Sequence, residues 1–572
     1  MKLLEALEVL RNAPMVEAEA LPVCLVCGFT PLHLQTLIAA HLQQRFPHRR
    51  VRIETGLYGD CLAGLKRVPA LQREASIVVL EWADLDPRLG LRRLSGWSPA
   101  DLPDILNTVA MRAALLEEGI RCAAEAAPVA LTLPTLPLPP VSYTPGWQAG
   151  AFELSLQEIL FKLGATLAQR PSVRVLEHQA LDARSPLRER LDVKSTLSAD
   201  FPYTLAHTDV LAELLAQAAL PPMPLKGIIT DLDNTLWSGI IGEVGADGVS
   251  WDLDHRSQIH GLYQQLLRSL ADAGILIAIA SKNAPEFATE GLKRADILLP
   301  LDKVFPIEIQ WGLKSEAVTR ILKAWNIGAD SVVFVDDSPT ELAEVQATHP
   351  GIHTLRFPHG SDQQAYELLE QLRTRFGKSA VSQEDALRLE SIRSAYQRTS
   401  DSGGESNPED FLKQSEPVLT VAFHKDPPDP RALELVNKTN QFNLNGKRYT
   451  EGQWQTYLNQ PETELMVASY EDKYGALGKI AVLTGRRDGA RFVVDSWVMS
   501  CRAFSRRIEF RCLQALFDTF GLEEIRFDYA ATERNGPLQD CMREILGAVP
   551  EANSILTREA FLRNCPPLYF RE

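Results

Sequence analysis

The sequence predicts an α/β protein with a doubly wound parallel sheet at its centre. Two observations lead to this fold class. Short apolar runs alternate with longer amphipathic segments over the first 222 residues and again from residue 226 onwards, and no internal repeat interrupts the alternation. Such alternation is typical of βαβ units, in which helices cover both faces of a sheet of parallel strands.

The first part of the chain predicts an α/β domain over residues 1–222. It opens with an amphipathic helix at 1–14, where Glu5 and Glu8 interrupt the apolar core that a signal peptide would need. The strands and helices expected after it lie at 23–29, 31–45, 50–54, 75–81, 151–169 and 173–176. Prolines at positions 221, 222 and 224 predict the end of this domain.

A second α/β domain is predicted over residues 223–378. Its expected strands lie at 227–230, 275–280 and 331–335, and its expected helices at 257–273 and 314–325. Residues 379–414 are expected to form a helical linker with a Ser- and Gly-rich flexible stretch. Residues 415–572 mix strand and helix patterns and are expected to form an α+β domain.

Composition and charge argue against several classes of protein. The 572 residues carry 59 Lys and Arg against 74 Asp and Glu, which gives a net charge of −15. This acidity argues against a nucleic-acid-binding protein held by a basic surface and against a polybasic protein of the membrane surface. A content of 45% apolar and 23% charged residues indicates a globular chain. No apolar run approaches the roughly 18 residues of a membrane span, so no membrane segment is expected.

The eight cysteines are too sparse for a disulfide scaffold. Cys24 and Cys27 form a CxxC pair inside the apolar run 22–28, and the second ligand pair that a zinc site needs is not evident. We interpret these two residues as buried thiols of a strand. Because unpaired cysteines fit a reducing compartment, we expect a cytoplasmic protein.

Two aspartates directly follow the predicted strand 227–230, in the sequence Asp231-Leu-Asp233-Asn-Thr. In a loop at a strand end, one carboxylate can attack a phosphorus atom while the other protonates the leaving oxygen. This chemistry assigns the nucleophile to Asp231 and the general acid and base to Asp233. Taken alone, the two aspartates are equally compatible with an Asp-rich turn.

Three further signals favour a phosphotransfer site over a turn. Ser281 directly follows an apolar strand and can bind a phosphate oxygen. Lys314 lies at a predicted helix start and can neutralise the charge of phosphate and nucleophile. Asp336 and Asp337 follow another strand and are hard oxygen ligands suited to Mg²⁺. All these groups fall at the carboxyl ends of strands, where open α/β sheets bind ligands.

The spacing of these residues leaves no room for a large cap domain. Asp231 precedes Ser281 by 50 residues, and Ser281 precedes Lys314 by 33. A site without a cap suits a bulky partner, or needs neighbouring domains to cover it. The segment 237–243 can form a small flap over the site.

A resemblance to a known family covers nearly the whole chain. The FkbH-like proteins, subfamily IIIC of the haloacid dehalogenase (HAD) superfamily, are similar in the motifs DLDNTLWSGIIGEVGADGV (231–249), SKN (281–283) and FVDDSPTELAEV (334–345) and in the segment around Lys314. Residues 437–444, 448–449 and 499–502 resemble the family's C-terminal domain, which has a fold like that of the GNAT acyltransferases. Residues 1–222 resemble, more loosely, its degenerate SGNH-hydrolase-like domain. The resemblance therefore implies a HAD-like Rossmannoid core between an SGNH-like and a GNAT-like domain.

The resemblance also implies a function. Characterised FkbH-like proteins take the glyceryl group of 1,3-bisphosphoglycerate, remove phosphate and load the glyceryl group as a thioester on an acyl carrier protein. Asp231, Asp336 and the backbone carbonyl of Asp233 would bind Mg²⁺, with Asp337 beside them, while Ser281 and Lys314 hold the phosphate. The substrate-binding residues that we infer on the same basis are Asn234, Thr235, Trp237, Lys282, Asn283, Asn440, Asn443 and Arg502.

Two alternative functions stay open. One is a plain phosphatase acting on a small phosphorylated biosynthetic intermediate, and the other is a non-catalytic scaffold that docks a carrier protein. Residues 231–340 contain no cysteine. A thioester on the enzyme therefore needs a thiol from another domain; otherwise the carrier's own thiol attacks the acyl phosphate.

The flanking segments depart from active enzymes of their types. Thr30 stands where an SGNH hydrolase has its nucleophilic serine, and His207 and Asp209 are a weak lead for the rest of a triad. Residues 502–507 contain no glycine, whereas acetyl-CoA-binding domains hold pyrophosphate on a glycine-rich loop.

Four arginines lie close together in the C-terminal segment, at positions 502, 506, 507 and 511. They form either a basic patch that docks an acidic carrier protein or a solvated helix face. A local patch of this kind would be needed for docking, because the chain and its expected partner are both acidic.

Overall fold

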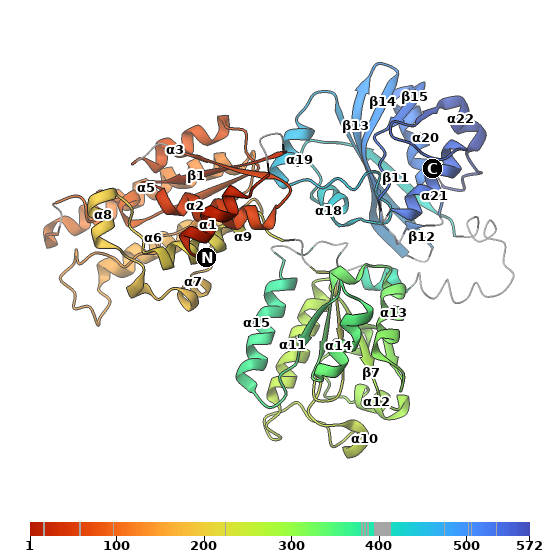
Figure 1. The fold of residues 1–572 in the computed structure, drawn as a ribbon, viewed down its shortest axis with the longest axis horizontal. Coiled ribbons are helices and arrows are strands. Elements are labelled where there is room, and N and C mark those ends of the chain that lie inside the picture. Colours follow the sequence, from red (N-terminus) through yellow and green to blue (C-terminus); the bar gives the residue numbers. More distant parts are fainter. Residues whose placement is uncertain are drawn as a thin grey trace. The chain divides into compact units, whose positions relative to one another are not determined.

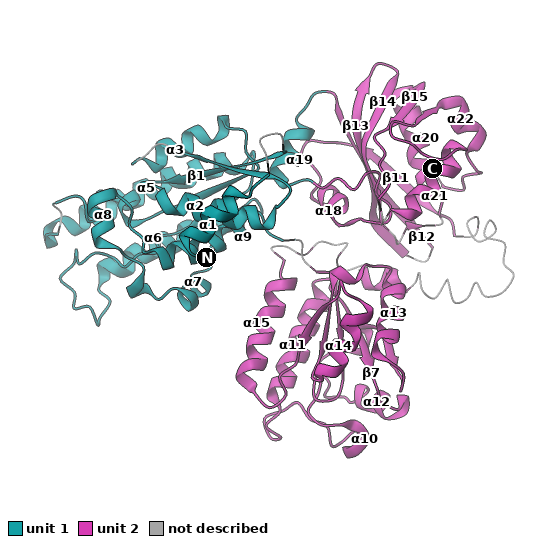
Figure 2. Ribbon diagram, viewed as in Figure 1, with its two compact units in different colours: residues 1–222, 449–461 teal, residues 223–448, 462–572 magenta. Residues whose placement is uncertain are grey.

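The computed structural model describes the chain except residues 15–17, 57–58, 95–96, 223–224, 379–380, 382–384, 386–387, 394–412, 414, 474, 501–502, 505, 533–534 and 572. The described residues form an α/β protein with three sheets, as predicted for the fold class (Figure 1). They divide into two compact units, residues 1–222 with 449–461 and residues 223–448 with 462–572 (Figure 2). No helix in this part of the chain combines the length and the apolar character needed to cross a bilayer.

The first unit is built on a parallel five-stranded sheet with strand order β2-β1-β3-β4-β5. Its strands are β1 (Ala20–Cys27), β2 (Arg50–Thr55), β3 (Ala75–Val79), β4 (Val129–Thr132) and β5 (Val173–Val175). Its helices are α1 (Leu3–Arg11), α2 (Leu32–Arg45), α3 (Cys61–Arg67), α4 (Trp82–Leu85), α5 (Leu102–Ala124), α6 (Ala151–Ala168), α7 (His178–Arg184), α8 (Val193–Ala199), α9 (Leu205–Ala219) and α19 (Glu451–Leu458). The elements predicted here are present, with ends shifted by up to three residues.

Cys24 and Cys27 are buried free thiols of β1, as predicted. Helix α19 comes from inside the predicted segment 415–572, yet it belongs to the first unit. It contacts the residue before β3, since Thr450 donates a hydrogen bond to Glu74 at 2.8 Å. A Cβ atom on Gly452 would lie 2.7 Å from the Glu74 backbone, so glycine permits this close approach.

The central sheet lies in the second unit and is parallel throughout, with strand order β10-β9-β6-β7-β8. Its strands are β6 (Gly227–Thr230), β7 (Leu276–Ser281), β8 (Val304–Ile309), β9 (Val332–Asp336) and β10 (His353–Arg356). The chain order along the sheet reverses between β6 and β9, so the sheet is doubly wound with its switch point there. Ligands of such sheets bind beyond the carboxyl ends of the strands at the switch point.

Helices bury both faces of this sheet. Ile228 of β6 packs in one apolar cluster with Tyr263 and Leu267, whereas Ile229 packs in another with Val318. Burying each such side chain stabilises the fold by roughly 1.5–3 kcal/mol. The helices around the sheet are α10 (Ile241–Val244), α11 (Gln258–Asp272), α12 (Pro285–Leu292), α13 (Lys314–Trp325), α14 (Pro339–Thr348) and α15 (Asp362–Phe376).

The third sheet also lies in the second unit and is mixed, with strand order β11-β12-β13-β14-β15-β16. Neighbouring strands are antiparallel except β14 and β15, which are parallel. The strands are β11 (Val418–Phe423), β12 (Thr463–Asp472), β13 (Gly475–Asp488), β14 (Arg491–Met499), β15 (Glu524–Phe527) and β16 (Ile555–Thr557). The helices are α18 (Pro430–Lys438), α20 (Ile508–Phe520), α21 (Gly536–Leu546) and α22 (Arg558–Asn564).

Candidate functional site

The site begins with Asp231, the residue that follows β6 at the switch point. Its side chain is almost completely buried, and its Oδ1 lies 3.0 Å from the ammonium of Lys314. None of the described residues donates a well-aligned hydrogen bond to that oxygen. Burial raises the pKa of Asp231, and the charge of Lys314 opposes the shift. Because the contact with Lys314 leaves acceptor capacity on this buried oxygen, the oxygen can also contact a ligand or a cation.

Lys314 lies between two carboxylates. It is the first residue of α13, and its Nζ is 2.6 Å from Oδ2 of Asp336 and 3.0 Å from Oδ1 of Asp231. Burial disfavours the charged form, but the two carboxylates outweigh burial and raise the pKa of Lys314 to about 12. The Ser315 backbone N–H donates to Glu344 at 3.2 Å, which anchors this helix start. The site therefore holds a fixed positive charge next to Asp231.

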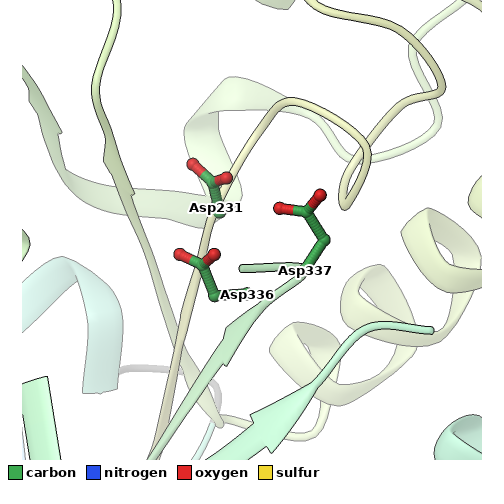
Figure 3. A group of neighbouring side chains, drawn as sticks. All are labelled: Asp231, Asp336 and Asp337. Carbon is green, nitrogen blue, oxygen red and sulfur yellow. The ribbon is translucent and has the colours of Figure 1, made fainter. Parts of the chain in front are cut away.

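Three carboxylates converge from the ends of β6 and β9: Asp231, Asp336 and Asp337 (Figure 3). One ligand oxygen of each lies within 4.8 Å of the others. Burial, together with the neighbouring charge of Asp231, raises the pKa of Asp336 to about 7, and burial also raises the pKa of Asp337. Crowded carboxylates repel one another and favour a cation between them. Three hard oxygen donors, one of them without a hydrogen bond, fit Mg²⁺.

Asp233 is held apart from that group by the flap. Its Oδ1 accepts hydrogen bonds from the indole N–H of Trp237 at 2.9 Å and from the backbone N–H of Ile241 at 3.1 Å. Its Oδ2 accepts one from Asn283 at 3.0 Å. The carboxylate is thus oriented by three donors and is free of the carboxylate cluster, which suits proton transfer better than metal ligation.

A tight turn leads from β6 into the flap at 237–243. Asn234 adopts a left-handed φ of 52°, and its side chain accepts a hydrogen bond from Gly239 at 3.2 Å. Ser238 and Ser250 form an isolated bridge that closes the segment. Thr235 contributes a buried hydroxyl for which no described residue supplies a hydrogen-bond partner. The predicted substrate-binding residues Asn234 and Thr235 therefore belong to the loop that carries Asp233.

Residues 281–283 lie at the end of the neighbouring strand β7. Asn283 donates to Ser281 Oγ at 3.1 Å as well as to Asp233, so it links the predicted phosphate-binding hydroxyl to the predicted acid. Lys282 instead forms an ion pair with Glu341 at 2.9 Å. Sequence reasoning missed Glu341, although Ser338-Pro-Thr-Glu341 has the pattern of a helix capping box and could have drawn attention to it.

The structure does not bring the other predicted substrate-binding residues to this site. Asn440 lines a cavity with Lys226, which precedes β6 and so lies at the opposite edge of the sheet from Asp231. Asn443 is buried, and its side chain accepts hydrogen bonds from the backbone of Asn445 and Gly446. The Asn443 side chain thus shapes a turn. Arg502 lies outside the described residues.

The predicted basic patch is not a uniformly exposed face. Arg506 is 9% exposed and lies over the ring of Tyr470 with Asp472 at 3.8 Å. Arg507 donates to the carbonyl of Pro567. A guanidinium that packs on an aromatic ring inside the fold cannot serve as a surface contact for a partner, so the patch loses at least Arg506.

In the first unit, the triad candidate His207 belongs to a buried network of polar side chains. His207 lies 2.9 Å from Ser185 and 3.2 Å from Thr135, whose hydroxyl donates to Glu81 at 2.6 Å. Burial lowers the pKa of His207 to about 3. Asp209 contacts His41 instead. Because His207, Ser185, Thr135 and Glu81 are all at least nine-tenths buried, this network acts as a polar core.

Comparison with solved structures gives a match that indicates a shared fold. No protein-family model and no curated protein matches the sequence. The solved N-terminal part of protein BF1531 from Bacteroides fragilis, described as containing a phosphatase domain complexed with Mg, matches with a TM-score of 0.52 at 20% identity. The match covers 66% of this chain and 100% of that one. The two chains share a fold.

A second solved structure, an uncharacterized protein from Corynebacterium glutamicum, matches at 16% identity and covers 27% of this chain and 98% of its own. Its TM-score of 0.20 is too low to indicate a common fold. The likeness of fold therefore rests on the phosphatase-domain structure.

Proposed function

We propose that this chain is a Mg²⁺-dependent HAD-type phosphotransfer enzyme, and that it releases phosphate from a small phosphorylated metabolite. The observation that carries the proposal is the buried group formed by Asp231, Asp336, Asp337 and Lys314 at the switch point of the central sheet. The phosphatase domain and the Mg named for the Bacteroides fragilis structure of the same fold support it.

In the proposed first step, an oxygen of Asp231 forms a bond to phosphorus while the bond from phosphorus to the substrate oxygen breaks. The product is an aspartyl-phosphate and a leaving oxygen, which takes its proton from Asp233. Lys314 and the hydroxyl of Ser281 hold the charge of the phosphoryl oxygens. Asn283 fixes the relative positions of Asp233 and Ser281 through its two hydrogen bonds.

In the proposed second step, a water molecule attacks the phosphorus of the aspartyl-phosphate. Asp233, now ionised, takes the proton of that water, and the bond from phosphorus to Asp231 breaks. Inorganic phosphate leaves, and both carboxyl groups return to their starting states. Asp231, Asp336 and Asp337 would hold Mg²⁺, which when bound neutralises charge on the phosphoryl group and its nucleophile.

Replacing the nucleophile tests this proposal directly. Asp231→Asn keeps the size of the side chain but removes the attacking carboxylate, so phosphate release from any substrate should fall by at least about 10³-fold, to background. The measurement is phosphate release in the presence of Mg²⁺, with a melting curve to show that the variant is folded. Survival of activity in the folded variant would refute Asp231 as nucleophile.

A second candidate function is the loading of a glyceryl or related acyl group on an acyl carrier protein. The observation that favours it is a set of exposed apolar side chains in the segments that follow the carboxyl ends of the strands, here called the apolar rim. Ile240 and Val244 beyond β6, Phe287 beyond β7, and Trp311 and Leu313 beyond β8 are all at least 40% exposed. Large exposed side chains around a site without a large cap suit a bulky partner. The loading hypothesis extends the first proposal and does not replace it.

The two functions break different bonds of an acyl phosphate. Attack of Asp231 on phosphorus releases the free acid, whereas thioester formation requires a thiol to attack the carbonyl carbon and expel phosphate with its bridging oxygen. Residues 231–340 supply no thiol, and of the described cysteines of the second unit Cys512 is buried, whereas Cys541 and Cys565 are partly buried in the C-terminal segment. We therefore propose that, in the loading reaction, the thiol belongs to the carrier's phosphopantetheine arm.

Isotope labelling separates the outcomes. The protein is incubated in H₂¹⁸O with Mg²⁺, 1,3-bisphosphoglycerate and holo-carrier protein. Thiol attack at C1 expels that phosphate unlabelled and adds the mass of a 3-phosphoglyceryl group to the carrier, which becomes a glyceryl group once the C3 ester is cleaved at phosphorus with release of one ¹⁸O-labelled phosphate. Hydrolysis at phosphorus without loading places one ¹⁸O in every released phosphate and leaves the mass of the carrier unchanged. Labelled phosphate without a mass gain would reject loading on that carrier. Neither signal, here or with other phosphate esters, would favour the non-catalytic scaffold.

A further inference from the structure

A second group of charged residues lies at the edge of the central sheet remote from Asp231. A cavity of about 110 Å³ opens there within the second unit. Lys226, which precedes β6, and Leu276, which begins β7, line it. Asp231 and Ser281 lie at the other ends of these same strands. The proposed catalytic steps therefore make no use of this cavity.

The floor of the cavity is apolar and belongs to the folded core. Leu276, Trp325 and Ile392 line it and are each at most 5% exposed. Trp325 is fixed in place, because its indole N–H donates to the carbonyl of Phe305 at 2.6 Å. The cavity is thus bounded by rigid side chains.

The wall of the cavity is cationic. Lys226, Arg388, Arg431 and Lys438 line it, together with one acid, Glu434. Arg431, Glu434 and Lys438 are spaced by three and four residues along α18 and so share one face of that helix. In a chain with a net charge of −15, a wall on which cations outnumber acids four to one is unusual.

Glu434 faces most of these cations and does not balance them. It forms ion pairs with Arg431 and, at 2.6 Å, with Lys438, and it lies 3.9 Å from Arg388. Although burial opposes the shift, Arg431 and Lys438 lower the pKa of Glu434 to about 2. Burial lowers the pKa of Lys438, Glu434 opposes this shift, and the charges of Arg388 and Arg431 add to it. Among the residues that line the cavity, the four cations therefore leave a net positive charge beside Glu434.

Arg431 supplies an unused donor at this wall. Its side chain is 8% exposed, and its Nε is buried without a hydrogen-bond partner among the described residues. A buried guanidinium N–H that lacks an acceptor costs free energy unless a ligand supplies one. Asn440, Gln441 and Ser500 add polar groups to the same lining.

We propose that this cavity binds the phosphate group of a small ligand, either inorganic phosphate or the head of a phosphate monoester. Arginine and lysine side chains are the residues that bind such dianions. A volume of 110 Å³ equals about four water molecules at about 30 Å³ each, which is room for a phosphate group. It is well below the roughly 300 Å³ of the smallest pockets that enclose drug-sized ligands. The site is separate from the one where phosphate is released.

Calorimetric titration of the full-length protein with inorganic phosphate tests the proposal. The titration uses a Lys314→Gln background, so that the catalytic site contributes little, and a constant ionic strength. One phosphate should bind, and Lys438→Gln should weaken it at least fivefold. Arg563→Gln removes an exposed arginine of α22 in the same unit and should leave the affinity unchanged. Glu434→Gln removes the opposing acid and should tighten binding severalfold, a gain that misfolding cannot produce.

A second titration, with glycerol 3-phosphate, shows whether the bound phosphate group belongs to free phosphate or to an ester. Tighter binding of the ester than of inorganic phosphate would assign the cavity to the head of a larger ligand, and the reverse order would assign it to free phosphate. Phosphate affinity that is equal in the Lys438→Gln and Arg563→Gln proteins would overturn the proposal, and so would the absence of binding in the Lys314→Gln background. Neither result bears on phosphate release at Asp231.

Discussion

Single residues decide the chemistry of the candidate site through their charges. Three carboxyl groups and one ammonium share a buried space, so the ammonium alone cannot balance the three carboxyl groups when all are ionised, and a cation can. Asp233 is not part of this group of charges, because three donors hold its carboxylate toward the flap and β7. Hydrogen bonding thus keeps Asp233, which would transfer the proton, apart from the residues that would hold the cation and the phosphate.

That separation predicts a kinetic signature for Asp233→Asn. The variant keeps an oxygen for Trp237 and Ile241 but loses the proton carrier, which slows both steps by about 10²–10⁴-fold for alkyl phosphates. p-Nitrophenyl phosphate needs no protonation of its leaving group, so the first step should survive with this substrate. We expect a burst of nitrophenolate equal to the enzyme concentration, followed by slow turnover. A steady rate equal to that of the unaltered protein would show that Asp233 does not transfer protons.

The raised pKa of Asp336 predicts how Mg²⁺ binding depends on pH. Because burial and Asp231 raise that pKa to about 7, the carboxyl group of the metal-free protein is protonated below pH 7 and ionised above it. Mg²⁺ must displace that proton, so its affinity should fall by about tenfold for each pH unit below 7 and level off above 8. Titration calorimetry between pH 5.5 and 8.5 measures this. An affinity that stays constant over the range would contradict the assignment of Asp336 as a ligand.

At the scale of elements, sequence adjacency explains how much of the site could be predicted. Asp231, Ser281 and Asp336 each end or directly follow an apolar run, so strand patterns alone place them at one sheet edge. Glu341 and the backbone N–H of Ile241 could not be found in this way, because neither residue ends a strand and their hydrogen bonds depend on how the loops fold. Asn440, taken from the family resemblance, lies at the other edge.

Strand β8 shows a limit of pattern reasoning. Its sequence VFPIEI carries Pro306 in the middle, and proline removes a ladder hydrogen bond, so the run is a weak strand signal. The structure tolerates this proline because β8 is an edge strand of the sheet. Helix α19 shows another limit, since no pattern in residues 449–461 indicates that they belong to the first unit.

The contact between β6 and α13 predicts a sensitive position. A Cβ atom on Gly227 would lie 2.5 Å from the ring of Trp325, and both residues are buried between the sheet and the helix. Gly227→Ala should therefore lower the free energy of unfolding by about 1–3 kcal/mol. Thermal melting measures it, with Gly536→Ala as the control, since a Cβ atom there meets nothing within 4 Å. Equal melting temperatures for the two variants would show that the ring moves aside.

At the scale of the whole molecule, the acidic composition limits which partners can approach the site. A net charge of −15 repels an acidic carrier protein at long range. The predicted arginine patch does not solve this, because Arg506 is packed inside the fold. The apolar rim offers a contact that does not depend on charge, and burial of its side chains would supply the binding free energy.

The rim therefore predicts a difference between large and small substrates. Phe287→Ser with Trp311→Ser removes two exposed rings of the apolar rim, at 50% and 74% exposure. If a carrier protein docks there, the KM for the carrier should rise at least fivefold, because each lost ring removes apolar contact area, while hydrolysis of p-nitrophenyl phosphate stays within about twofold. Leu562→Ser, a 65% exposed residue of α22, is the matched control and should change neither rate. Equal losses with the carrier and the small ester would assign the two rings to the shape of the catalytic site, because a docking surface affects only the substrate that touches it.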